Sequence, residues 1–121
     1  MPILNYLSLA VRDYQESRNW YAINLGLKVE FEVPGDRLAA LQDDTGLTIF
    51  LQEEEQVAPI PSTVLYFQVE SAEAMYRQLA ARGVDVVHPP QMQPWGFGME
   101  LRDPTGYRVR LWDEETMPAS E

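Results

Sequence analysis

The chain contains no cysteine, which excludes disulfide bonds, thiolate nucleophiles and zinc sites built on cysteine. It is also poor in basic residues: 9 Lys and Arg stand against 19 Asp and Glu, and a formal net charge of −10 makes nucleic acid an unfavourable partner. No apolar run approaches the roughly 20 residues of a membrane span, and the first residues lack the basic head and cleavage site of a signal peptide. We therefore expect a cytoplasmic protein that binds neither nucleic acid nor membrane.

Apolar residues, in contrast, are plentiful. They make up 45% of the 121 residues, and the chain carries 3 Trp, 6 Tyr and 4 Phe. A chain of this length and composition can bury a core, and its length fits one compact domain. We expect a single domain over residues 1–121.

Two stretches of the chain have the same order of features. In the first, apolar residues alternate over Ile3–Val11, which predicts a strand with two different faces. Asp13 then predicts the N-cap of a helix that Gly26 terminates. Three short strands follow, at Lys28–Val33, Leu38–Gln42 and Thr48–Gln52.

The second stretch repeats this order. A strand is predicted over Thr63–Val69, followed by a helix that Ser71 caps and Gly83 ends, and by strands at Val84–Val87, Gly96–Arg102 and Tyr107–Trp112. Val11 corresponds to Val69, and Gly26 corresponds to Gly83. The repeat predicts an α+β fold of two βαβββ modules, each a curved mixed half-barrel. Their bounds are about 3–53 and 63–113, with a linker at about 54–62 and an acidic tail at 114–121.

Several short motifs occur in a fixed order along both modules: Val11-Arg12-Asp13, Trp20-Tyr21, Leu25-Gly26-Leu27, Gln68-Val69-Glu70-Ser71, Gly83-Val84, Pro94-Trp95-Gly96 and Arg102-Asp103-Pro104-Thr105-Gly106-Tyr107. In this order they resemble the vicinal oxygen chelate superfamily, which includes glyoxalase I, extradiol dioxygenases and bleomycin-resistance proteins. The resemblance covers about residues 1–113 and is greatest to the bleomycin-resistance branch. It implies the glyoxalase/bleomycin-resistance fold and a homodimer.

The resemblance also implies where metal-dependent members would hold their ion. The matching positions are Tyr6, Val64, Arg110 and one within Thr48–Gln52, where Gln52 is the plausible donor. Valine has no donor atom, and arginine does not lose its proton to become a ligand. We therefore expect no metal, no other cofactor and no catalytic residues. His88, the one histidine, lies beside Pro89-Pro90, away from these positions, and is interpreted as a surface residue.

Strand alternation predicts which side chains line the hollow of the sheets. On the last strand it places Arg110 and Trp112 inward, and a tight hairpin would put Met99 opposite Arg110 and Glu100 on the other face. Arg110 would then need Glu100, another acid, an anionic ligand group or water as its partner, and the placement of Glu100 on the other face favours the ligand. The predicted ligand-binding residues are Tyr6, Phe50, Tyr66, Trp95, Phe97, Met99, Arg110 and Trp112.

Three functions fit these residues. The first is a metal-free binding protein that sequesters an aromatic or polycyclic ligand in a crevice between the subunits of a dimer. The second is an enzyme, either glyoxalase-like or a metal-independent isomerase, in which Tyr6 or Glu100 would act as acid or base. The third is an interaction domain whose barrel is filled by its own side chains. Arg110 favours an anionic ligand, whereas the net charge of −10 favours a cationic one. The charge of the ligand is therefore open, and the binding protein is the function we predict.

Overall fold

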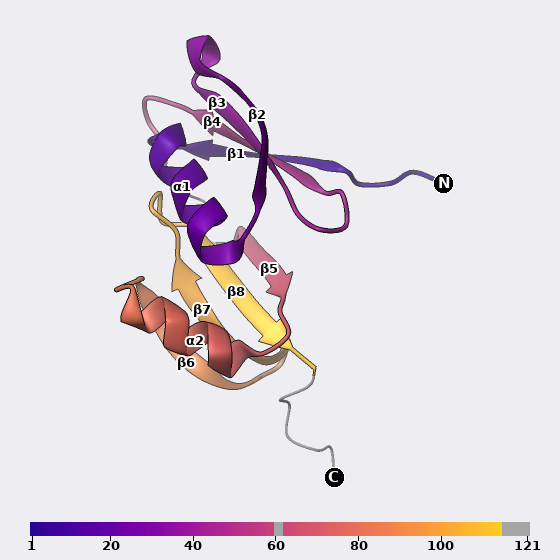
Figure 1. The fold of residues 1–121 in the computed structure, drawn as a ribbon, viewed down its shortest axis with the longest axis vertical. Coiled ribbons are helices and arrows are strands. Elements are labelled where there is room, and N and C mark those ends of the chain that lie inside the picture. Colours follow the sequence, from indigo (N-terminus) through magenta and orange to yellow (C-terminus); the bar gives the residue numbers. More distant parts are fainter. Residues whose placement is uncertain (60–61, 115–121) are drawn as a thin grey trace. The chain divides into compact units, whose positions relative to one another are not determined.

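The computed structural model describes residues 1–59 and 62–114 of the chain. The chain divides into two compact units, Met1–Ala58 and Pro59–Glu121, called unit 1 and unit 2 below. Unit 1 contains β1 (Tyr6–Val11), α1 (Tyr14–Leu25), β2 (Lys28–Val33), the short 3-10 helix η1 (Pro34–Asp36), β3 (Leu38–Gln42) and β4 (Thr48–Glu53). Its four strands form one mixed sheet in the order β1-β4-β3-β2, in which β1 runs parallel to β4. Figure 1 shows α1 beside this sheet.

Unit 2 repeats the same architecture. It contains β5 (Val64–Gln68), α2 (Ala72–Ala81), β6 (Val86–Gln93), β7 (Gly96–Arg102) and β8 (Arg108–Asp113), with sheet order β5-β8-β7-β6. The parallel pair is again the first and last strand, and the remaining pairs are antiparallel (Figure 1). The predicted α+β fold of two βαβββ modules is confirmed.

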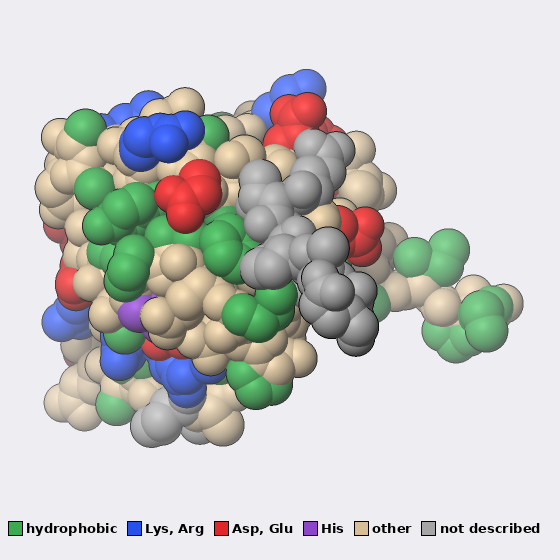
Figure 2. All heavy atoms as spheres, turned by 90° about the horizontal axis from the view of Figure 1, so that it is seen from below, with side chains coloured by type: hydrophobic (Ala, Val, Ile, Leu, Met, Phe, Trp, Pro, Cys, Tyr) green, Lys and Arg blue, Asp and Glu red, His purple; other side chains and the backbone are tan. Residues whose placement is uncertain are grey.

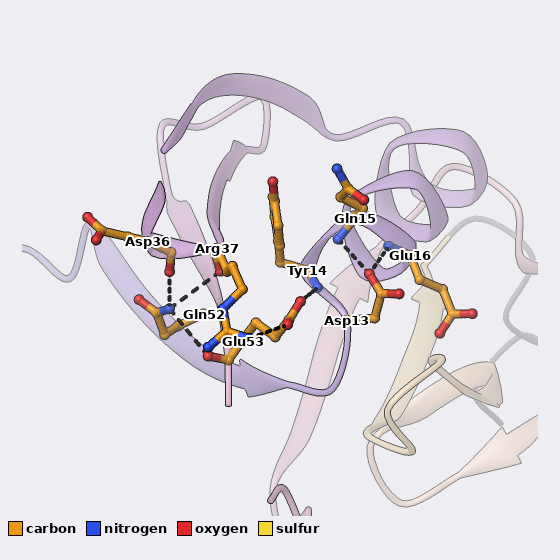
Figure 3. A network of polar contacts seen from close by, with 8 residues as sticks. All are labelled: Asp13, Tyr14, Gln15, Glu16, Asp36, Arg37, Gln52 and Glu53. Carbon is orange, nitrogen blue, oxygen red and sulfur yellow. Dashed lines mark hydrogen bonds and ion pairs between the residues drawn. The ribbon is translucent and has the colours of Figure 1, made fainter. Parts of the chain in front are cut away.

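Both helices begin at the predicted capping residues. The Asp13 carboxylate accepts hydrogen bonds from the amides of Gln15 and Glu16, which satisfies two donors that the first turn of α1 leaves open (Figure 3). The Ser71 hydroxyl accepts one from Ala74 at the start of α2. Helix α1 ends at Gly26, whose φ of 72° lies in the left-handed region that glycine adopts without a Cβ clash.

A second carboxylate ties each helix to its own sheet. Glu53, the last residue of β4, accepts a hydrogen bond from the amide of Tyr14 and also pairs with Arg37 (Figure 3). Asp113, the last residue of β8, accepts one from the amide of Ala72 and is fully buried. In both units the end of the fourth strand therefore fixes where the helix starts, and a negative charge lies at the positive end of the helix dipole.

The core lies between each helix and one face of its sheet. In unit 1 it is built from alternate residues of β1, β3 and β4, among them Val11, Leu41 and Leu51, with Tyr21 from the helix. In unit 2 the corresponding residues include Leu101, Val109, Leu111 and Leu79. The alternation means that every second strand residue points to the opposite face of the sheet, away from the helix.

Among residues 1–59 and 62–114, neither the length nor the hydropathy of any helix suits a membrane span.

The β6 strand is longer than predicted. It runs from Val86 to Gln93 and includes Pro89 and Pro90, although proline residues in the sequence favoured an end near Val87. The strand lies at the edge of its sheet, and its register with β7 shifts between His88 and Gln91, so neither proline has to donate to the ladder. The predicted tail at 114–121 falls outside the described residues except for Glu114, as do positions 60–61 of the predicted linker.

The predicted hairpin between β7 and β8 is wrong by one residue. The Asp103 carboxylate accepts hydrogen bonds from the amides of Thr105, Gly106 and Tyr107, and the amide of Asp103 donates to the carbonyl of Tyr107. These bonds close a loop of residues 103–107, so Arg102 faces Arg108 and Glu100 faces Arg110. Glu100 and Arg110 therefore share one face of the sheet, whereas the predicted tight turn placed them on opposite faces.

Candidate functional site

The face of the unit 2 sheet that points away from α2 gathers aromatic and charged side chains. The ladders place Tyr66 beside Arg110 and Arg110 beside Glu100 across three neighbouring strands. Trp112, one step further along β8, faces the same way and pairs with Gly98. These positions follow from alternation alone, because Val109 and Leu111 between them are fully buried on the helix side.

Arg110 lies between two aromatic rings. Its guanidinium carbon is 5.2 Å from the centroid of the Tyr66 ring and 5.0 Å from that of Trp95. The two rings also meet edge to face, with centroids 5.7 Å apart. A guanidinium at these distances is attracted to the faces of aromatic rings, and Nη1 of Arg110 also donates to the Tyr66 hydroxyl. The cation is thus held in one orientation.

Glu100 neutralises part of the positive charge at this face. Its carboxylate accepts a hydrogen bond of 2.8 Å from Nε of Arg110 and two of 3.2 Å from Arg108. The Glu100 side chain is only 6% exposed. Burial acts to raise the pKa of this carboxyl, but the hydrogen bonds and charges of Arg108 and Arg110 outweigh it and hold the pKa below its ordinary value. The same pairing raises the pKa of Arg110 against the opposing effect of burial.

Gly98 provides the space that Trp95 occupies. A Cβ built at Gly98 would lie 2.8 Å from Cζ3 of Trp95 and 2.2 Å from the carbonyl oxygen of Leu111. No larger residue fits there without moving the backbone of β8. The loop tryptophan therefore packs over the sheet because the strand beneath it lacks a side chain at this point.

His88 is a member of this cluster that the sequence interpretation missed. Its ring lies 6.4 Å from that of Trp95, and it is the ladder partner of Glu100. Nδ1 of His88 lies 2.8 Å from the carbonyl oxygen of Pro89. The pairing of His88 with Glu100 could have been predicted from the sequence only if β6 had been expected to continue through the two prolines.

Unit 1 carries a different cluster on the corresponding face. Tyr6 and Phe50 lie with ring centroids 5.4 Å apart, and Phe31 lies 6.1 Å from Phe50. Tyr6 is 59% exposed and Phe31 is 46% exposed. Phe31 was not among the predicted site residues. The register shift between Val29 and Phe31 pairs it with Ala40 and puts it on the face opposite to that of Val29. Figure 2 does not label this cluster; it shows hydrophobic side chains gathered beside the histidine, which is His88 of unit 2.

The eight predicted ligand-binding residues divide into three groups. Tyr66, Trp95, Arg110 and Trp112 lie on the unit 2 face, and Tyr6 and Phe50 lie on the unit 1 face. Met99 is fully buried and pairs with Leu111, so it lies in the core and its predicted place opposite Arg110 is wrong. Phe97 shares the face of Met99 by alternation, and its predicted orientation is wrong for the same one-residue reason.

The residues at the positions where the resemblance implies metal ligands do not fit an ion. Arg110 is paired with Glu100 and Tyr66, and Val64 offers no donor. The strand pairings show that the unit 1 residue corresponding to Arg110 is Phe50 and not Gln52. Phe50 pairs with the third residue of β1, and Arg110 pairs with the third residue of β5. Gln52 instead donates to the carbonyl of Asp36 in unit 1 (Figure 3). Within 1–59 and 62–114, no group of three or more His, Asp or Glu residues could hold a metal ion.

Comparison with known proteins places the chain in a family. Residues 3–111 match the model of the Glyoxalase/Bleomycin resistance protein/Dioxygenase superfamily, so the chain belongs to this superfamily. The predicted resemblance is confirmed. No curated protein matches the chain.

Solved structures of this superfamily share the fold. A possible glyoxalase from Bacillus cereus aligns with a TM-score of 0.82 at 20% identity, covering 93% of this chain and 99% of its own. Lactoylglutathione lyase from Agrobacterium tumefaciens gives 0.74 at 17% identity, with 93% and 94% covered. The bleomycin-binding protein of Streptomyces verticillus, solved with copper(II)-bleomycin, gives 0.72 at 20% identity, with 95% and 99% covered. Both an enzyme and a binding protein thus share this architecture.

Proposed function

We propose that this chain is a metal-independent binding protein of the bleomycin-resistance type, which sequesters an aromatic or polycyclic small molecule. The observation that carries the proposal is Arg110, a fixed cation stacked between Tyr66 and Trp95 at a position where metal-dependent relatives need a donor atom. A site that has exchanged an ion ligand for a stacked guanidinium can still hold a molecule by shape and ring contacts.

Aromatic surface is available for such contacts. Tyr66 is 49% exposed, and Trp95 is half-buried beside it. Burying apolar surface of a ligand against these rings yields about 25 cal/mol for each Å² removed from water. In unit 1, Tyr6 and Phe31 offer further exposed ring area, with Phe50 packed between them. Affinity would then depend on stacking and apolar burial, with polar groups fixing orientation.

The proposal extends to a homodimer in which the ligand occupies a crevice between subunits. The open edges of each sheet and the exposed aromatic side chains support it, because pairing of two copies covers both. The bleomycin complex of the Streptomyces verticillus protein is a precedent for ligand binding on this fold.

Tryptophan fluorescence tests the proposal. The purified protein is titrated with a panel of bleomycin, proflavine and neutral polycyclic compounds, and we expect saturable quenching by at least one of them. The variant Trp95→Phe should lose most of this signal, whereas Trp20→Phe, on α1 beside Tyr21, should retain it. Calorimetry and sedimentation then give the stoichiometry and the oligomeric state.

Two results would overturn the proposal. One is the absence of any saturable response across the panel by both fluorescence and calorimetry. The other is stoichiometric zinc, nickel, iron or manganese in the purified protein together with turnover of a glyoxalase substrate, which would favour the enzyme.

A further inference from the structure

The unit 2 face is basic, although the chain as a whole is strongly acidic. The ladders of β7 and β8 place Arg102, Arg108 and Arg110 on this face, and Glu100 is the one acidic residue that strands β5–β8 contribute to it. Three of the nine basic residues of the chain thus share this face with a single strand carboxylate, which pairs with Arg108 and Arg110. Electrostatic attraction at this face is toward anions, against the sign of the net charge.

Arg110 has hydrogen-bonding capacity left on its outer edge. Nε donates to Glu100 and Nη1 to the Tyr66 hydroxyl, while Nη2 donates to no group among residues 1–59 and 62–114. This nitrogen is not sealed inside the protein either, because Ser17 Oγ is the one buried side-chain atom without a partner in the same ranges. The Nη2 N–H groups can therefore donate a charge-assisted hydrogen bond to a carboxylate.

The aromatic rings set the shape of the ligand. Trp95 covers one side of the guanidinium, and its ring contacts Tyr66 and His88 as well. A flat ring that stacks on this edge-to-face group while its acid group meets Arg110 would use both features at once. An aliphatic acid would use only the charge, and a neutral ring only the stacking.

Resting on the proposed function, we infer that the unit 2 face selects a planar aromatic carboxylate, with Arg110 as the residue that recognises its acid group. Glu100 acts as a positioning residue: it holds Arg110 through Nε, and Nη2 of the guanidinium is left for the ligand. The inference decides the charge of the ligand, which the sequence left open, in favour of an anion.

Three matched probes test this inference by calorimetry: 2-naphthoate, the neutral 2-naphthamide and the cationic 2-naphthylmethylammonium. We expect the wild-type protein to bind 2-naphthoate about tenfold more tightly than 2-naphthamide, as a charge-assisted hydrogen bond allows. The preference should shrink as salt is raised from 0.05 M to 0.5 M, since exposed charges are screened. The cation should bind most weakly.

Variants then assign the preference to Arg110. Arg110→Gln should reduce 2-naphthoate affinity to that of 2-naphthamide and leave the amide unchanged, and Arg110→Lys, which keeps the charge without the planar fork, should lose part of the preference. The matched control is Arg18→Gln, which removes an arginine paired with Glu32 in unit 1 and should change nothing. If Arg110→Gln does not fold, the comparison of probes on the wild type and on Arg110→Lys still decides.

The outcomes separate this inference from the proposed function. Equal affinity for 2-naphthoate and 2-naphthamide, or tighter binding of the cation, overturns the anion preference while leaving an aromatic binder. Failure of all three probes while bleomycin or proflavine binds does the same. Failure of the three probes and of the whole fluorescence panel overturns both.

Discussion

The two units share a sheet order, a capped helix and a strand-end carboxylate, yet they differ in the cross-strand pairs on the sheet face that points away from the helix. Unit 1 has Ala40 beside Phe50, whereas unit 2 has Glu100 beside Arg110 at the corresponding rungs. The helix-facing residues of both sheets remain apolar. In this scaffold the helix-facing side chains of each sheet stabilise the fold. The side chains on the other face can therefore be apolar in one unit and an ion pair in the other.

A second difference lies two residues along the strands, on the same face of each sheet. Leu38 faces Gln52 in unit 1, but Gly98 faces Trp112 in unit 2. The missing side chain admits Trp95, which covers Arg110. Gly98 therefore supports the ion pair of Glu100 and Arg110, because the tryptophan that it admits limits the contact of the charged groups with water.

Loss of the Glu100 carboxylate should have the largest effect on stability. Glu100→Gln leaves Arg108 and Arg110 facing each other without their shared anion, and we expect a loss of about 2–3 kcal/mol in the free energy of unfolding, below the range for a fully buried pair. Urea denaturation measures it. The double variant Glu100→Ala with Arg110→Phe copies the unit 1 pair and should recover most of the loss; a double variant less stable than Glu100→Gln would mean that the two faces are not interchangeable.

Adding a methyl group at Gly98 should break the second difference. Gly98→Ala forces the new Cβ against the Leu111 carbonyl and the Trp95 ring, and overpacking of this kind costs about 1–3 kcal/mol. The tryptophan emission maximum should shift to the red as Trp95 is displaced. The control is Gly35→Ala in unit 1, where a Cβ meets nothing within 4 Å, and its stability should match the wild type. Equal effects of the two variants would contradict the role assigned to Gly98.

Acid should weaken unit 2 through Glu100. Since the pKa of Glu100 lies below its ordinary 4.5 in the folded protein, the carboxylate stabilises the fold fully above that pH and less as pH falls through the folded-state value. Between pH 7 and pH 3, Glu100→Gln should therefore lose less stability than the wild type. Asp43→Asn gives the unit 1 comparison, because hydrogen bonds from Thr45 and Leu47 lower the pKa of Asp43 despite burial. An unchanged pH dependence in Glu100→Gln would show that the ion pair does not contribute.

Ser17→Ala should have the smallest effect and the opposite sign. The Ser17 hydroxyl is buried and has no hydrogen-bond partner within the described ranges, and its counterpart in α2 is the apolar Met75. Removing an unsatisfied polar group from a helix should raise the free energy of unfolding by about 0.5–1 kcal/mol. Chemical denaturation beside Ser71→Ala, which removes a capping bond and should destabilise, checks the sign.

The sequence predicted most of the fold because local chemistry determines it. Asp13, Gly26 and Ser71 have few alternatives as caps and stops, and the strands Lys28–Val33, Leu38–Gln42 and Gly96–Arg102 have the predicted bounds. The repeat along the chain then predicted two βαβββ modules, and both sheets have the same strand order.

The site was harder to predict because it depends on registers that single residues set. One additional residue in the loop closed by Asp103 moved Glu100 to the face of Arg110 and Met99 into the core. A register shift in β2 placed Phe31 on the same face as Ala40, and the continuation of β6 through two prolines paired His88 with Glu100. Alternation has a period of two, so each such event reverses every side chain beyond it.

The prolines of β6 also bear on how this chain could associate with itself. A strand whose row of amide donors is interrupted by proline is a poor template for the addition of another strand, whereas β2, with no proline in Lys28–Val33 and every residue exposed, keeps its donors. Sheet extension by intermolecular strand pairing, and any fibril that grew from it, would accordingly be less favourable at the β6 edge of unit 2 than at the β2 edge of unit 1.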